Sequence, residues 1–157
     1  VLFRSFHFAT KHDLLAAVLE HVLRAMAAAE GVPEALEGED PLAELLAVMH
    51  AEMARVTGDR ELARLFFDFS VMGARSRSVR ARMSAELARY RRAFRPLVRQ
   101  VLEVEGKRFS GVTPDGLCAA VVAFIKGAAL QSVIDPRGFD VGGFLAASDA
   151  LLVPRSL

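Results

Sequence analysis

The residues best placed to do chemistry lie near the N-terminus, in the stretch 6–15. Thr10 is a typical helix N-cap, and Asp13 follows three residues later, where a carboxylate favours the positive end of a helix. Lys11 falls in the first helical turn, where a cation is unfavourable unless an anion lies nearby. Bare backbone amides together with a lysine form a phosphate-binding site, so the stretch predicts a phosphate contact. The competing interpretation makes Lys11 a solvated charge and the neighbouring apolar residues plain core.

The other reactive side chains show no catalytic or metal-binding pattern. The four histidines lack the i, i+4 spacing with a carboxylate that a zinc-binding helix needs. Cys118 is the only cysteine, which excludes an internal disulfide and a cysteine zinc cluster. It sits in an apolar helical segment, where a thiol is usually inert. We therefore expect no metal, no cofactor and no enzymatic activity; an enzyme that uses Cys118 or a histidine is the weakest alternative.

The composition predicts one all-α domain. The chain has 157 residues, of which 53% are hydrophobic, and it contains only six prolines, so it can bury a substantial core. Alanine and leucine are abundant, whereas isoleucine and threonine are sparse. A net charge of +1 favours no particular class of partner. We expect no membrane-spanning run and no signal peptide, and a single cysteine is consistent with a reducing, cytoplasmic location.

Start and stop signals predict a bundle of about six helices. Asp40-Pro41 and Thr113-Pro114 each combine an N-cap with a proline at the first helical position. Pro96 lies inside the longest helical segment and should kink it. The expected helices cover residues 11–30, 41–57, 59–73, 76–105, 114–134 and 140–153.

Six residues near the N-terminus give the chain a family resemblance: Phe6, His7, Phe8, Thr10, Lys11 and Leu14. They resemble the end of the DNA-binding domain in the TetR family of bacterial transcription regulators. There an aromatic-His-Phe turn is followed by a capped helix that joins the DNA-binding head to the ligand-binding body. Phe6 departs from the tyrosine usual in that turn. The resemblance implies that His7, Thr10 and Lys11 contact DNA phosphates, which position a protein without reading bases.

The resemblance also implies a domain organisation. Residues 1–5 resemble the translation of a sequencing adapter, and we expect them to be a non-native scar. Residues 6–30 would be the remnant of the DNA-binding head with its connecting helix, and residues 31–157 the effector-binding and dimerisation domain. A helix-turn-helix head needs helices upstream of these, so we expect a truncated chain that binds operator DNA only with the missing head.

Aromatic and methionine side chains recur at helical spacing in the middle of the chain. Together with a few polar groups they predict a pocket for a small apolar or amphipathic effector, although such residues are often plain core. The expected pocket residues are Phe66, Phe69, Met72, Met83, Leu87, Tyr90, Phe94, Phe124 and Gln131.

The resemblance implies a homodimer in which helices 114–134 and 140–153 form a four-helix bundle with their counterparts in a second subunit. The expected interface residues are Leu117, Val121, Ile125, Ala128, Ala129, Val133, Phe144 and Leu151. The function so implied is a ligand-responsive, DNA-binding transcriptional regulator, most commonly a repressor. The alternative is a stand-alone helical module that dimerises or binds a lipid-like ligand without binding DNA.

A run of nine arginines and one glutamate between residues 75 and 99 allows two interpretations. It could bind nucleic acid, because phosphate contacts need lysine and arginine. We favour a solvated helix face balanced by acidic residues between positions 30 and 52, since charge runs on helices mostly lie at the surface.

Overall fold

The computed structural model describes residues 10–28 and 40–152, which form seven helices and no strand. The helices are α1 (Lys11–Ala28), α2 (Pro41–Gly58), α3 (Arg60–Arg75), α4 (Arg77–Ala93), α5 (Arg95–Val104), α6 (Pro114–Ile134) and α7 (Val141–Leu152). The predicted all-α fold is therefore confirmed. The expected scar at 1–5, the turn at 6–8 and the end of the first helix at residues 29–30 lie outside the described residues.

The helices begin where the capping residues predict. The Asp40 carboxylate accepts hydrogen bonds from the backbone amides of Leu42 and Ala43, both at 3.0 Å. The Thr113 hydroxyl accepts one from the Gly116 amide at 3.1 Å. These side chains satisfy amides that have no partner within the first helical turn. Short sequence signals thus fix the starts of α2 and α6.

The long helix expected over residues 76–105 is two helices, which raises the number from about six to seven. Phe94 separates α4 from α5, and its amide bonds to the carbonyl of Arg92 rather than to one a full turn back. Pro96 has no N–H to donate, and its ring clashes with the carbonyl four residues earlier. The proline therefore breaks the helix instead of only bending it.

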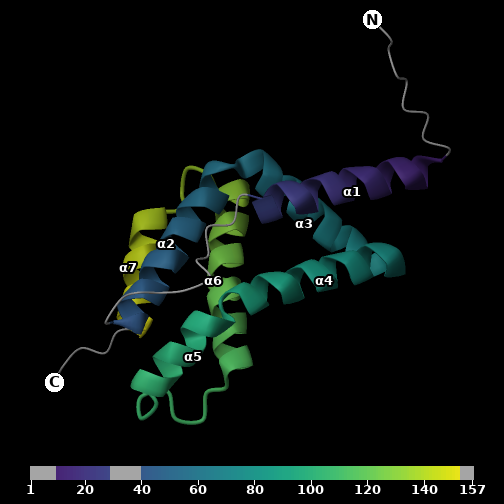
Figure 1. The fold of residues 1–157 in the computed structure, drawn as a ribbon. Helices are drawn as coiled ribbons and strands as arrows, with labels where there is room; N and C mark the ends of the chain where they lie inside the picture. The colour runs from purple at the N-terminus through teal and green to yellow at the C-terminus, as the bar shows by residue number, and fades with distance from the viewer. Residues whose placement is uncertain (1–9, 29–39, 153–157) are drawn as a thin grey trace, which may run out of the picture.

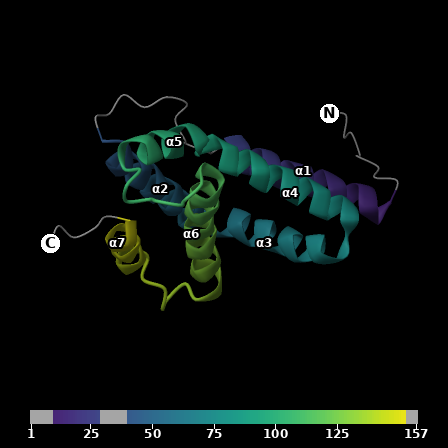
Figure 2. The ribbon, with the colours of Figure 1, turned by 90° about the horizontal axis from the view of Figure 1, so that it is seen from below.

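α6 stands at the centre of the molecule, and α2, α3, α4, α5 and α7 all pack against it (Figure 1). α1 lies outside this group, beside α3 and α4 (Figure 2). Two hydrophobic clusters result. The main core joins α2, α5 and α6 with the end of α4. The second cluster, here called the α1 core, lies between α1, α3 and α4.

α6 is long and apolar enough, by length and composition alone, to cross a membrane, contrary to the expectation that no segment would be. Eight of its residues are buried against the rest of this chain. The core helix of a soluble protein passes the same test, so this finding is weak evidence for a membrane span.

Candidate functional site

A buried carboxylate lies on the inner face of α2. Glu52 is only 2% exposed because it shares this face with Leu45, Met49 and Val56. Burying a charge is costly unless it is paired and hydrogen-bonded. Glu52 meets this requirement through two neighbours: the Tyr90 hydroxyl donates to Oε2 at 2.6 Å, and Arg55 donates from Nη2 to Oε2 at 2.7 Å and from Nε to Oε1 at 3.1 Å.

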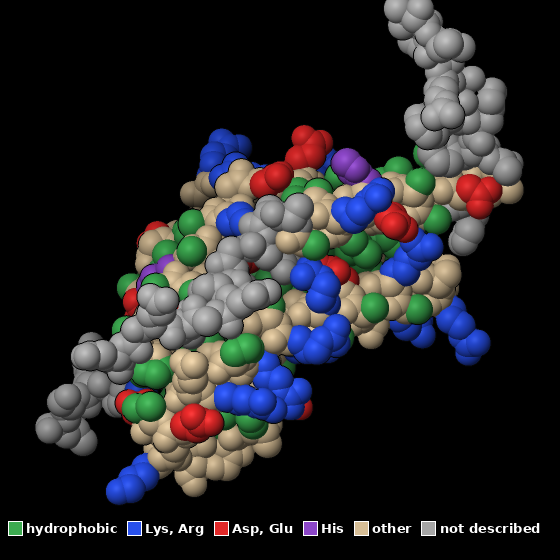
Figure 3. Space-filling view, in the orientation of Figure 1, with side chains coloured by type: hydrophobic (Ala, Val, Ile, Leu, Met, Phe, Trp, Pro, Cys, Tyr) green, Lys and Arg blue, Asp and Glu red, His purple; other side chains and the backbone are tan. Residues whose placement is uncertain are grey.

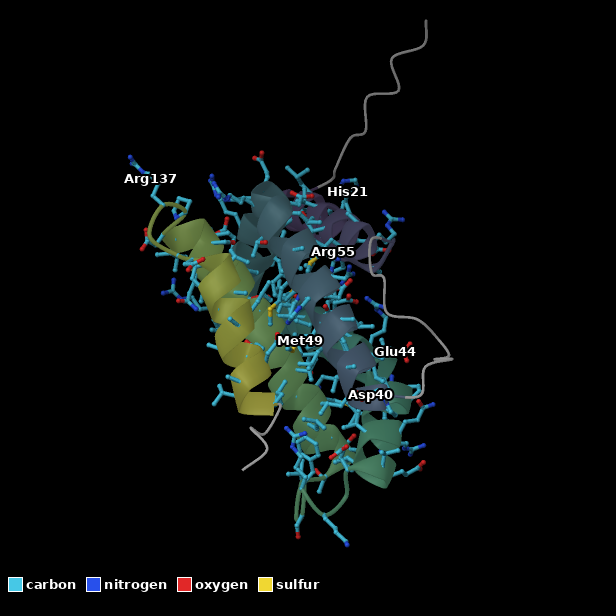
Figure 4. All side chains as sticks on the ribbon, turned by 90° about the vertical axis from the view of Figure 1, so that its left-hand side faces the viewer. His21, Asp40, Glu44, Met49, Arg55 and Arg137 are labelled. Carbon is cyan, nitrogen blue, oxygen red and sulfur yellow. The ribbon has the colours of Figure 1, made fainter. Side chains whose placement is uncertain are left out.

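Arg55 is held in its charged form by this arrangement. Burial lowers the pKa of Arg55, but the hydrogen bonds and negative charge of Glu52, together with Tyr90, raise it more, so the net shift is upward. The guanidinium is therefore a permanent positive charge in the last turn of α2, where Figure 4 labels Arg55.

A second cation reaches this region from α6. The Lys126 ammonium lies over two aromatic rings, 4.4 Å from the centroid of Phe66 and 4.8 Å from that of Tyr90. The negative face of an aromatic ring attracts a cation at such distances. Lys126 thereby links α6 to α3 and α4 at the level of Glu52.

A cavity lies beside these charged groups, where α1, α2, α3 and α6 meet. The space that accepts a water-sized sphere is only about 10 Å³, so the surrounding side chains nearly fill the cavity. Three charged residues border it: Arg55, Asp59 and Lys126. The rest of the lining is apolar: Met26, Val56, Leu62, Ala63, Phe66, Phe67 and Ala129. The arrangement suits an amphipathic small molecule, because it combines an apolar wall with a few charged groups.

The residues expected to share one pocket lie in different places. Phe66 lines the cavity, and Leu87 and Tyr90 lie next to Lys126 beside it. Phe124 packs against Phe144 of α7, with ring centroids 6.1 Å apart, and Gln131 is exposed on the outer side of α6. The remaining expected pocket residues pack in the two cores. Phe94 belongs to the main core, and Phe69, Met72 and Met83 belong to the α1 core.

The charged residues at the cavity were missed by sequence reasoning, although a signal was present. Glu52 occupies a position on the apolar face of α2 that helical spacing assigns to the core. Lys126 interrupts an otherwise apolar helix. A charged residue at a core position is the informative exception, because such residues are rarely buried without a partner.

Five of the eight residues expected at the dimer interface are buried inside their own chain: Leu117, Val121, Ile125, Ala128 and Ala129. Val133 and Phe144 are half-buried against the main core, and Leu151 is exposed. α6 instead presents small and apolar residues outward: Ala119, Ala120, Ala123, Leu130 and Ile134. α6 is apolar almost all round, so its sequence pattern could not distinguish the two faces.

The start of α1 has the expected capping geometry. The Thr10 hydroxyl donates to the Asp13 carboxylate at 2.8 Å and accepts from the Asp13 amide at 3.2 Å. Lys11 is exposed in the first turn. His7, the third expected phosphate contact, lies outside the described residues.

Basic side chains gather over α4 and the neighbouring part of α1 (Figure 3). Several arginines of the run 75–99 have structural partners. Arg80 donates to the carbonyls of Gly73 and Ala74 at the end of α3, and Arg82 pairs with Glu20 of α1 at 3.2 Å. These arginines therefore connect neighbouring helices, although their side chains lie at the protein surface.

No group of three or more metal-ligating side chains occurs within residues 10–28 and 40–152. Cys118 is buried in the main core, and burial, assisted by the negative charge of Asp115, raises the pKa of its thiol. A raised pKa keeps the thiol protonated and therefore a poor nucleophile.

Comparison with protein families identifies the chain. The family model described as BetI-type transcriptional repressor, C-terminal, matches residues 41–153, which include α2 to α7 and thus the outer face of α6 and the whole lining of the cavity except Met26 of α1. No curated protein and no solved structure matches the chain. The match covers well over half of the sequence and agrees with the all-α bundle. The chain therefore belongs to the TetR family of transcriptional regulators, with a BetI-type C-terminal domain over residues 41–153.

Proposed function

We propose that this protein is the ligand-responsive body of a transcriptional repressor, active in the cytoplasm as a homodimer. A small apolar or amphipathic effector occupies the cavity between α1, α2, α3 and α6. One observation carries the proposal: Met26 of α1 lines the same cavity as residues of α2, α3 and α6. α1 is also the helix that a TetR-type regulator uses to connect its body to its DNA-binding head.

The nearly filled cavity suggests how binding becomes movement. A molecule of ten or more heavy atoms needs far more than about 10 Å³, so the lining must separate to admit it. Within the described part of the chain, α1 contacts only α3 and α4 appreciably, whereas α6 contacts five helices. α1 is therefore the wall that moves most easily. An effector that binds the displaced arrangement more tightly shifts the population toward it and changes the spacing of the two DNA-binding heads.

The proposed dimer uses the outer faces of α6 and α7. Ile134 is 72% exposed, Leu151 is 74% exposed and Leu130 is 38% exposed. The alanines between them allow two helices to approach closely. Exposed apolar residues gathered on one face are typical of association surfaces. The DNA contacts proposed for Thr10 and Lys11 lie at the N-terminal end of α1, and the contact proposed for His7 lies outside the described residues.

The effector proposal can be tested with three probes that share a ten-carbon chain and differ in head group: decanoate, 1-decanol and decyltrimethylammonium. Each is added below the concentration at which it forms micelles, and the melting temperature is measured. At a ligand concentration of 100 times Kd, binding should stabilise the protein by about 2.7 kcal/mol. At least one probe should therefore raise the melting temperature clearly.

A Leu62→Trp variant supplies the control, because Leu62 is half-buried in the cavity wall and an indole there fills the space. This variant should fold but lose the stabilisation. Equal stabilisation of the variant and the parent protein would place the binding site elsewhere. No stabilisation by any of the three probes would contradict effector binding in this cavity.

A further inference from the structure

We propose that the chain has a second binding site, for a small oxyanion with two negative charges, such as a phosphate group. The site is a recess between the end of α4, the start of α5 and the first turns of α6. It shares no lining residue with the effector cavity. Along α6, Cys118 of the recess lies about 12 Å before Lys126 of that cavity. The second site therefore goes beyond the proposed function.

Two stripes of side chains form the recess. The stripe from α4 and α5 consists of Ala88, Arg91, Arg92 and Arg95. These residues recur at steps of three and four, so they share one face across the break between the two helices. Asp115 and Cys118, three residues apart on α6, complete the lining. Three arginines are thus brought to one small space.

The charges of this lining do not balance. The three arginines and the single carboxylate of Asp115 leave a net charge of +2. Asp115 lies 3.3 Å from Arg95, oxygen to nitrogen, and its side chain is 76% exposed, so water screens its charge. Within residues 10–28 and 40–152, Arg91 and Arg92 form no ion pair. A dianion would match the charge that remains.

Arg95 is also short of acceptors. Its Nε atom is buried and has no hydrogen-bond partner among the described residues. Buried donors in folded proteins nearly always have a partner. Because this atom is buried, it cannot touch a ligand in the recess directly. A guanidinium whose charge meets only one exposed carboxylate nevertheless attracts an anion placed beside it.

The acids on the other side of Arg92 already have arginine partners. Arg92 also borders the groove between α1 and α4, which Glu20 and Glu86 line as well. Glu20 pairs with Arg82 at 3.2 Å, and Glu86 pairs with Arg89. These two carboxylates are therefore matched within the groove and do not neutralise the recess.

The size of the recess and the type of its side chains indicate the class of ligand. It offers about 210 Å³, less than the roughly 300–1,000 Å³ of pockets for drug-sized molecules. Guanidinium groups donate pairs of parallel hydrogen bonds to phosphate oxygens, and these charge-assisted bonds are stronger than bonds between neutral groups. The ligand is thus a free phosphate ion or the phosphate end of a small molecule.

A bound phosphate would connect α4 to α5 across the break at Phe94. Arg91 and Arg92 precede the break, and Arg95 follows it. An anion held from both sides restrains the angle between the two helices. Because α4 is one of the two helices against which α1 packs, the phosphate would also restrain the support of α1.

Isothermal titration calorimetry at constant ionic strength tests the site with inorganic phosphate, glycerol 3-phosphate and, as a monoanion, acetate. At pH 7.5 a phosphate monoester carries nearly two negative charges. At least one of the two phosphates should bind, and acetate should bind at least about tenfold more weakly, as the loss of one charge-assisted contact implies. Tighter binding of inorganic phosphate would identify the free ion as the ligand, and tighter binding of glycerol 3-phosphate would identify a phosphorylated small molecule.

Two variants and a matched control locate the binding. Arg91→Gln and Arg92→Gln should each weaken phosphate binding about tenfold, and both should fold because these side chains are exposed. Arg77→Gln, at the exposed start of α4, removes the same charge far from the recess and should change nothing. Leu62→Trp, which fills the effector cavity, should bind phosphate as the parent protein does.

Four results would overturn the second site. They are failure of both phosphates to bind, binding of acetate as tight as that of phosphate, affinities that Arg91→Gln and Arg92→Gln leave unchanged, and equal weakening by Arg77→Gln. Loss of phosphate binding in Leu62→Trp would instead place the phosphate in the effector cavity, which also overturns it. The ten-carbon probes test the effector cavity separately, so the proposed function can stand or fail independently of this site.

Discussion

At the scale of single residues, the most consequential feature is the Glu52 carboxylate inside an apolar helix face. Two of its partners come from different parts of the chain, Arg55 from the next turn of α2 and Tyr90 from α4. Helical spacing could have shown that position 52 is buried. It could not have shown that Tyr90 supplies a hydrogen bond, because that contact spans 38 residues and depends on how α2 and α4 pack.

Replacing Tyr90 by Phe removes one hydrogen bond to Glu52 while leaving the ring in place. We expect the free energy of unfolding to fall by about 1–3 kcal/mol, since a buried acceptor at a charged group loses its donor. Urea denaturation measures the change. In a Glu52→Gln background the same replacement should cost less, because the charge is gone. Equal costs in the two backgrounds would show that the hydroxyl does not act through Glu52.

Cys118 should be unreactive in the folded protein, because burial raises the pKa of its thiol and keeps it protonated. The folded state then holds this proton more tightly than the unfolded chain does. The contribution of this thiol to the free energy of unfolding is fully present below its ordinary pKa, about 8.5. That contribution is lost as the pH rises above this value. The free energy of unfolding should therefore decline as the pH rises above about 8.5. Cys118→Ala should show a smaller decline; an identical decline would exclude the thiol as the cause.

At the scale of helices, the sequence predicted element types and starts well but not the faces of α6. Caps such as Asp40 and Thr113 act locally, and the structure confirms them. The break at Phe94 also has a local cause in Pro96. Which side of α6 enters the core depends on five neighbouring helices. A helix that is apolar all round carries no pattern from which that choice could be read.

The outer face of α6 provides the test at this scale. Ala123 is exposed on that face, so Ala123→Glu should leave the fold intact and place a charge in the proposed interface. We expect light scattering coupled to size-exclusion chromatography to show a monomer where the parent protein is a dimer. Ala81→Glu, on the exposed side of α4, is the matched control and should remain dimeric. A dimer that survives Ala123→Glu would exclude this face as the interface.

At the scale of the whole molecule, the central helix α6 borders the cavity and also carries the face proposed for the dimer. Lys126 and Ala129 of α6 border the cavity, whereas Ala123 and Ile134 face outward. In the proposed dimer, α6 would stand between the two subunits as the fixed element against which α1 moves. The family resemblance predicted a body of this kind, but only the packing shows that α1 forms one wall of the cavity.

The most direct test of this account measures whether an effector moves α1 in the dimer. Spin labels are attached at Ala17→Cys, an exposed position on α1, in a Cys118→Ala background, and the distance between the two labels is measured by double electron–electron resonance. A second pair at Glu103→Cys on α5 serves as the control. The account predicts that a saturating concentration of the ten-carbon probe that raises the melting temperature most shifts the distance at position 17 and leaves that at position 103 unchanged. An unchanged distance at position 17 while that probe is bound would contradict it.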